Sequence, residues 1–269
     1  MIDYLQPDYF KKLFYDQKYI ILFLFLFGLS FQFLWVSLLF ESDIGTFIGA
    51  YAELLPPFIM NMIGVKTGSE MFFAQMTAFG YAHPLVLMAL AFLPVSIPAR
   101  YIAGEIENKT FDILLTKPID RGLIVVQLFL FLVLCFLLLF VGFFSGTFLG
   151  SWIFNVSLQL SVFVEICLAG FCFYLSMAAI SLAVAVFNRE RGKTLTYIIS
   201  IMVVLYFYDT IIRAASSLEY LVSYSYFQLY QPVKYVMEEI NIGNSVLISL
   251  LITVIFFIIS LLKFNRRDL

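Results

Sequence analysis

The sequence predicts an all-helical integral membrane protein, a single domain over residues 1–269 that crosses the bilayer six times. Hydrophobic residues make up 62% of the chain and charged residues only 13%, with a mean hydropathy of +0.98. Soluble domains do not have this composition, because water would then meet an almost wholly apolar surface. Six apolar stretches have the length of a membrane crossing, and the basic residues between them are unevenly distributed. These three observations predict the fold class.

Each predicted crossing is a run of mostly apolar residues close to the length of about 20 that a hydrocarbon core of about 30 Å requires. Pro94 and Pro98 each remove a backbone hydrogen bond, so a kink is expected near the end of the second crossing. The predicted membrane helices are residues 19–40, 84–103, 123–145, 160–187, 194–212 and 245–262.

The orientation of the chain is predicted from its basic residues, since cytoplasmic loops carry an excess of Lys and Arg. With the amino terminus inside, thirteen basic residues fall on the inner side, and Lys66, Arg213 and Lys234 fall on the outer side. We therefore expect both termini in the cytoplasm and a multi-pass protein of the cytoplasmic (inner) membrane, surrounded by the lipid bilayer. The net charge of −2 gives no reason to expect a nucleic-acid partner.

The two outer segments, after the first and fifth crossings, are expected to form helices in the membrane interface. Pro56 and Pro57 precede an apolar patch in the first segment, where proline is tolerated in a first helical turn. Aromatic residues crowd the second segment, including Tyr220, Tyr224 and Tyr230. An interfacial belt explains these rings, and a substrate site is the alternative.

The cytoplasmic loop 104–121, between the second and third crossings, is the most informative stretch of the sequence. Phe111, Leu114 and Leu115 recur at helical spacing with Ile106 before them, and Pro118 ends the helix that this spacing predicts. The loop therefore predicts a short amphipathic helix beneath the membrane. Its apolar face has two interpretations, contact with lipid headgroups or docking in a groove of a soluble partner. The excess of acidic residues favours the partner, because an anionic leaflet does not attract carboxylates.

The residues of this loop resemble those of permeases of the type 2 exporter class of ATP-binding-cassette (ABC) transporters. The resemblance in layout extends over nearly the whole chain, through the Pro56-Pro57 patch and the ending 264–269, whereas only the loop is specific in residues. One departure is Asn108-Lys109, where an Arg-Gly pair or similar is common, so the local helix geometry is expected to differ. The matching positions are Ala103, Gly104, Glu105, Glu107, Thr110, Asp112, Leu114, Leu115, Pro118 and Arg121.

The resemblance implies a permease subunit of an exporter, without enzymatic activity, that couples to a separate cytoplasmic ATPase. Two copies of that ATPase would bind ATP and Mg²⁺, whereas this chain would bind no cofactor. A second permease subunit would complete the membrane pathway, as a homodimer or a heterodimer. The implied ATPase-coupling residues are Glu105, Glu107, Thr110, Phe111, Asp112, Leu114, Leu115, Pro118 and Arg121.

Two further groups of charged residues are candidates for function. Arg189, Arg191 and Lys193 lie in the turn between the fourth and fifth crossings, which is either a second ATPase contact or a lipid-facing basic turn. The adjoining Gly-Lys-Thr sequence lacks the first glycine and the preceding strand of a nucleotide-binding P-loop. Candidate pathway residues are Glu165, Asp209 and Arg213, of which the last two are spaced to form an ion pair along a helix.

Two alternatives to the permease stay open at the level of sequence. A membrane-embedded enzyme acting on lipid or peptide would require His83, Glu165 and Asp209 to converge. A single histidine without a placed nucleophile argues against a catalytic triad or zinc site, and His83 is expected to be an interfacial or helix-capping residue. The second alternative is a non-transporting assembly subunit. The three cysteines lie in apolar runs without metal-ligand spacing, and the sequence leaves the cargo open.

Overall fold

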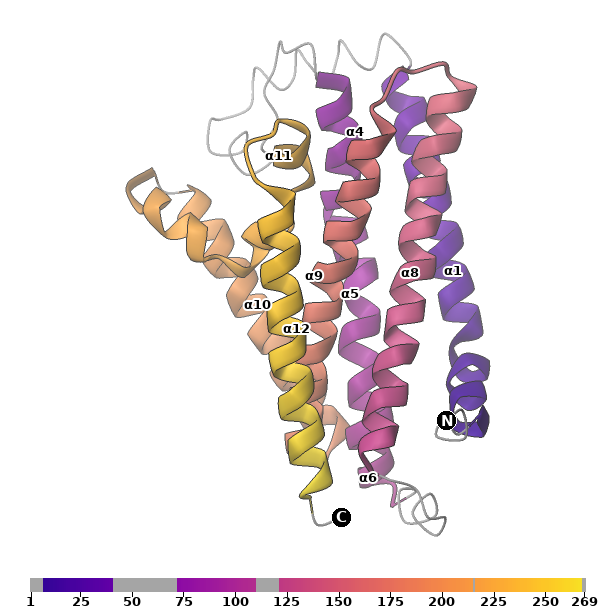
Figure 1. The fold of residues 1–269 in the computed structure, drawn as a ribbon, viewed down its shortest axis with the longest axis vertical. Coiled ribbons are helices and arrows are strands. Elements are labelled where there is room, and N and C mark those ends of the chain that lie inside the picture. The colour runs from indigo at the N-terminus through magenta and orange to yellow at the C-terminus, as the bar shows by residue number, and fades with distance from the viewer. Residues whose placement is uncertain (1–6, 41–71, 110–120, 215, 268–269) are drawn as a thin grey trace.

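A computed structural model of the chain describes residues 7–40, 72–109, 121–214 and 216–267. All regular structure within these ranges is helical, and six helices or helix pairs are long and apolar enough to cross a membrane (Figure 1). The elements are α1 (Pro7–Phe40), α4 (Phe72–Ala82), α5 (Pro84–Pro98), π-helix η1 (Ala99–Gly104), α6 (Glu105–Glu107), α8 (Arg121–Ile153), α9 (Leu160–Phe187), α10 (Arg191–Ala214), 3-10 helices η2 (Ser216–Tyr224) and η3 (Tyr226–Leu229), α11 (Pro232–Val236) and α12 (Ile242–Asn265).

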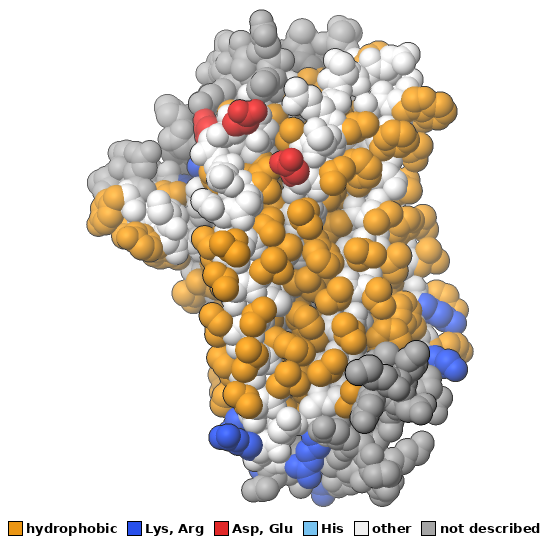
Figure 2. All heavy atoms as spheres, in the orientation of Figure 1, with side chains coloured by type: hydrophobic (Ala, Val, Ile, Leu, Met, Phe, Trp, Pro, Cys, Tyr) orange, Lys and Arg blue, Asp and Glu red, His pale blue; other side chains and the backbone are white. Residues whose placement is uncertain are grey.

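The two ends of the bundle differ in charge, in the manner that the sequence predicts. Helix α1 begins and α12 ends at the same end, beside α6 (Figure 1). Figure 2 shows Lys and Arg gathered around this lower end, Asp and Glu near the opposite end, and a broad hydrophobic band between them. The band is the surface that hydrocarbon would cover. We call the end that carries α6 the inner end and the opposite end the outer end.

Helix α9 is the centre of the bundle. In α9, 78% of an apolar 18-residue stretch is buried inside the bundle, whereas the buried share of such a stretch is 17% in α10 and 22% in α12. Its small side chains, among them Gly170, Ala178 and Ala179, let α5, α8 and α12 approach closely. Helix α10 leans away from the other helices toward its outer end (Figure 1), which leaves most of its surface exposed.

Helices α1 and α8 pack through a stripe of glycines. Gly142, Gly146 and Gly150 recur every four residues on α8, the small-xxx-small spacing that brings two membrane helices into backbone contact. A methyl group added at Gly142 would lie 2.9 Å from the carbonyl oxygen of Phe25, and one at Gly150 would lie 2.8 Å from Cβ of Val36. The contact therefore has no room for a side chain.

The second crossing consists of two helices and a π-helix. His83 adopts an extended conformation (φ −59°, ψ 136°) because the following Pro84 disfavours the helical region, and this ends α4. The Nδ1 atom of His83 accepts a hydrogen bond from the backbone N–H of Leu85 at 3.3 Å, which confirms its predicted capping role. The π-helix η1 begins directly after Pro98, where the missing N–H disturbs the regular hydrogen-bond ladder. The prolines thus lie just before α6 and the loop that follows it.

The outer segment after α10 is only partly exposed. Tyr220 and Tyr224 are 69% and 79% exposed, whereas Tyr230 packs against Phe173 of α9 with a ring-centroid distance of 5.6 Å. The described part of this segment is helical, in η2, η3 and α11. Tyr230 therefore belongs to the core rather than to an interfacial belt. The helix expected after Pro56 and Pro57 lies outside the described residues.

Candidate functional sites at the two ends of the bundle

The described part of loop 104–121 is held to α1 and to α10. Lys12 of α1 forms an ion pair with Glu105 at 3.2 Å. Oε2 of Glu107 accepts a hydrogen bond from the backbone N–H of Arg191 at 2.8 Å, at the first residue of α10. A carboxylate is favourable there, because the first N–H groups of a helix lack partners and carry partial positive charge. The segment Glu105–Glu107 therefore connects two helices that are distant in sequence.

Most of the loop's other candidate residues lie outside the described residues, as does the amphipathic helix expected from them. They are Thr110, Phe111, Asp112, Leu114, Leu115 and Pro118. Arg121 is the first residue of α8, and its guanidinium donates a hydrogen bond to the backbone carbonyl of Arg267. Two residues of the basic turn that was predicted as a second contact have partners here. Arg191 lies against Glu107, and Lys193 pairs with Glu190 at 2.6 Å. The proposed first and second contacts are thus neighbours.

Arg267, one of the basic residues at the inner end, binds the end of α9 through its side chain and Arg121 of α8 through its backbone carbonyl. Its guanidinium donates to the carbonyl of Val186, in the last turn of α9, at 2.7 Å and to that of Asn188, just after the helix, at 2.9 Å. Burial, and after it the charge of Arg189, lowers the pKa of this guanidinium, but the group stays protonated at neutral pH. Through Arg267, the end of α12 holds the α9–α10 turn beside Arg121.

Lys109, the second residue of the Asn108-Lys109 departure, adopts a backbone conformation that favours glycine. Its φ is 55°, a left-handed conformation that glycine adopts without a Cβ penalty and that often follows a helix end. We predict that Lys109→Gly raises the free energy of unfolding by about 1 kcal/mol by removing this penalty. Thermal unfolding in detergent measures the change. Lys109→Ala is the matched control, since it removes the same charge but keeps the Cβ; equal effects of the two substitutions would contradict the prediction.

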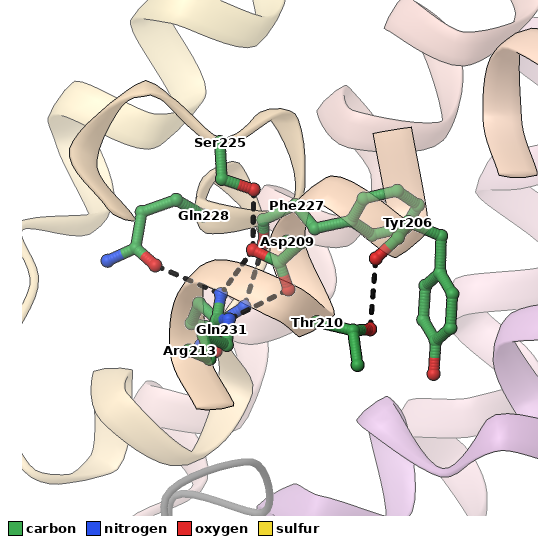
Figure 3. A network of polar contacts seen from close by, with 8 residues as sticks. All are labelled: Tyr206, Asp209, Thr210, Arg213, Ser225, Phe227, Gln228 and Gln231. Carbon is green, nitrogen blue, oxygen red and sulfur yellow. Dashed lines mark hydrogen bonds and ion pairs between the residues drawn. The ribbon is translucent and has the colours of Figure 1, made fainter. Parts of the chain in front are cut away.

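At the outer end, Asp209 and Arg213 of α10 form the ion pair that their spacing predicts, within a larger network (Figure 3). The guanidinium of Arg213 donates to both carboxylate oxygens of Asp209, at 2.7 and 3.0 Å. It also donates to the side-chain oxygens of Gln231 at 2.9 Å and Gln228 at 3.0 Å. Ser225 donates to Asp209. Since the ion pair is 7% and 11% exposed in its side chains, these neutral partners replace the water that the two charges lose.

A groove runs beside this network, between α10 and the junction of α4 with α5. Its volume is about 180 Å³, and aromatic and apolar side chains supply most of its wall. Asp209 and Arg213 line it, whereas Glu165, the third candidate pathway residue, is exposed on α9 and does not. The groove is lined by Phe79, Ala82, Pro84, Leu87, Tyr206, Asp209, Thr210, Arg213, Phe227, Tyr230, Gln231, Pro232, Val233 and Lys234.

The residues that an embedded enzyme would need have different contact partners. His83 lies among the rings of Phe31, Trp35 and Phe79, at centroid distances of 5.4 to 5.8 Å. Asp209 is bound to Arg213 and Ser225. Glu165 is exposed on α9 and does not line the groove beside Asp209. Within the described ranges there is no group of three or more His, Cys, Asp or Glu residues placed to hold a metal ion. The three cysteines, which lie in apolar runs of the sequence, are buried.

The six apolar crossings define a multi-pass membrane protein. The sequence model of the ABC-2 family transporter proteins matches residues 9–269 of the chain. The chain therefore belongs to the ABC-2 transporter family, which confirms the resemblance seen in the loop and supports a role as a transporter permease. No curated protein and no solved structure shows a significant match to the chain.

Proposed function

We propose that the chain is the permease subunit of an ABC exporter, coupled through residues 104–121 to a separate cytoplasmic ATPase. In this proposal the inner end of the bundle faces the cytoplasm, and both termini lie there, because the basic residues cluster at that end. Two ATPase copies bind ATP and Mg²⁺ below two permease subunits in the inner membrane. The permease itself carries out no enzymatic reaction.

The observation that carries this proposal is the double attachment of the coupling segment. Lys12 joins Glu105 to α1, and the N–H of Arg191 joins Glu107 to α10. A displacement of the loop by an ATPase would act directly on α10, which is the least buried of the six crossings. The outer end of that helix holds Asp209 and Arg213 beside the groove. A pathway role for these two residues, and for Glu165, is part of the proposal.

ATP can drive such a cycle only if the docked ATPase favours one arrangement of the membrane helices over the other. A permease attached by a slack loop would not transmit that preference. Here the described part of the loop is held at both sides by hydrogen bonds to its carboxylates, from Lys12 of α1 and from the backbone N–H of Arg191 of α10. This supports coupled transport rather than a passive assembly role.

The docking of the loop is tested by charge substitutions at its predicted apolar face. We expect Leu114→Asp or Leu115→Asp to abolish co-purification of ATP-hydrolysing activity with the tagged chain, because a carboxylate cannot enter an apolar groove unpaired. Membrane insertion and yield should not change. The readout is ATP hydrolysis in the purified complex, related to the amount of permease.

Tyr220→Asp is the control, since it places the same charge at an exposed aromatic position of the outer end. It should leave the ATPase bound. If the Leu114 and Leu115 variants retained a normally active ATPase, the assignment of this loop would be wrong. An ATPase that binds but never responds to any candidate cargo would instead favour the non-transporting assembly subunit.

A further inference from the structure

The first turns of α1 present an exposed face of basic and aromatic side chains to the outside of the bundle. Lys11, Tyr15 and Lys18 are spaced by four and three residues, so they share one side of the helix, with Tyr19 next to them. All four are exposed, Tyr15 to 72% and Tyr19 to 74%. We call Lys11, Tyr15, Lys18 and Tyr19 the basic–aromatic face. Neither the coupling segment nor the outer network uses it.

The two tyrosines hold the ammonium group of Lys18 at the helix surface. Its Nζ lies 4.0 Å from the ring centroid of Tyr15 and 5.0 Å from that of Tyr19. Both distances are within the range of favourable cation–π contact. Tyrosine rings prefer the boundary between hydrocarbon and water, where the hydroxyl is hydrated and the ring is not. The face therefore has the chemistry of the headgroup level.

An apolar strip continues directly from this face toward the middle of the bundle. Leu22 follows Lys18 at a spacing of four residues, and Leu26 follows Leu22 at the same spacing, with Phe23 alongside. They are 54%, 49% and 66% exposed, respectively. In Figure 2, basic side chains likewise lie at the margin of the hydrophobic band on the side where Figure 1 places α1. A molecule seated here meets cations at one end and hydrocarbon at the other.

The charge of this face is positive between Lys11 and Leu26. The one carboxylate between Lys11 and Leu26, Asp16, is exposed, and its Oδ2 accepts a hydrogen bond from the hydroxyl of Tyr101 at 3.1 Å. Lys12, the remaining lysine of these turns, is directed to Glu105 instead. Lys11 and Lys18 are about 10 Å apart along the helix axis, close enough for their long side chains to reach one phosphate group.

We propose that the basic–aromatic face binds an anionic phospholipid, with its phosphate between Lys11 and Lys18 and an acyl chain along Leu22 and Leu26. A zwitterionic lipid fits less well, because its ammonium group would add positive charge next to two lysines. Free phosphate would meet the lysines but gain nothing from the apolar strip. The site is independent of the proposed coupling to an ATPase.

The test uses the full chain in nanodiscs that contain phosphatidylcholine with a small fraction of spin-labelled phosphatidylglycerol. We expect selective association of the labelled lipid with the wild-type chain, and a weakening of roughly thirtyfold in Lys11→Gln/Lys18→Gln, since each basic residue near a charged surface favours anionic lipid. Lys11→Arg/Lys18→Arg should retain it. Lys12→Gln/Lys193→Gln is the matched control, because it removes the same charge from two lysines that already pair with carboxylates.

Three results would overturn the proposal. One is undiminished association in the Lys11→Gln/Lys18→Gln variant, and another is an equal loss in the matched control. The third is displacement of the labelled lipid by millimolar inorganic phosphate, which would make the site a simple anion site. A thermal unfolding scan in the same nanodiscs shows whether each variant is folded. If Lys11→Gln/Lys18→Gln is not folded, lipid association of Lys11→Arg/Lys18→Arg compared with the wild-type chain decides the case.

Discussion

Arg213→Met is expected to lower the free energy of unfolding by about 3 kcal/mol or more. The substitution preserves a long apolar stem but leaves the buried carboxylate of Asp209 without its cation, and it removes the donor that Gln228 and Gln231 share. Removing one partner of a buried ion pair typically costs 3–5 kcal/mol, because the other charge stays buried and unpaired. Reversible unfolding in mixed micelles measures the loss.

Two variants separate this explanation from a general sensitivity to substitution. Asp209→Leu combined with Arg213→Met removes both charges, so it should recover part of the loss, and the double-mutant cycle gives the interaction between the two residues. Lys193→Met breaks the exposed pair with Glu190 and should have little effect on stability, because water screens that pair. If Arg213→Met cost no more than Lys193→Met, the network of Figure 3 would not contribute to stability.

Gly146→Val is expected to have an effect of similar size, through packing rather than charge. A Cβ at this position would overlap the backbone carbonyl of Leu29 and lie 3.0 Å from Cβ of Gln32. Neither neighbour can give way without separating α1 from α8, because one is main chain and the other is buried. Overpacking of a close contact typically costs 1–3 kcal/mol, and a clash with backbone falls at the upper end. The same unfolding assay reads the change.

Gly192→Val provides the matched control for this substitution. It introduces the same side chain in a helix, but a Cβ at Gly192 would have no atom within 4 Å other than its chain neighbours and the adjoining backbone of its own helix. We expect its stability to change by less than 1 kcal/mol, since valine and glycine differ little in helix propensity. A similar loss in both variants would mean that the helix and not the α1–α8 contact is sensitive.

The sequence was sufficient to predict the fold class, because the cost of placing polar backbone and charge in hydrocarbon leaves few alternatives. Hydropathy identified the apolar runs but not how far each helix continues into the polar ends. Helix α1 begins at Pro7, in a polar stretch, and α4 precedes the run that starts at Pro84. Packing against the bundle stabilises these turns, and composition does not reveal it. The Gly142, Gly146 and Gly150 spacing was a readable signal for the α1–α8 contact.

The candidate sites were predictable only where contacts are local in sequence. The pairing of Asp209 with Arg213 follows from their spacing of four residues on one helix. Gln228 and Gln231 reach the same guanidinium across a chain reversal, which no periodicity indicates. The contacts of Glu107 with α10 and of Arg267 with the end of α9 join residues about 80 positions apart. Such pairs depend on how the helices assemble, and a single sequence carries no local signal for them.

The hydrogen bond from α10 to Glu107 has a consequence for which residues position 191 can accept. The donor is the main-chain amide, so the arginine side chain is not needed for the connection, and nearly every amino acid would preserve it. Proline is the exception, although it is otherwise well suited to the first position of a helix, because it has no amide hydrogen to offer. At position 107, by contrast, the bond depends on the side chain itself.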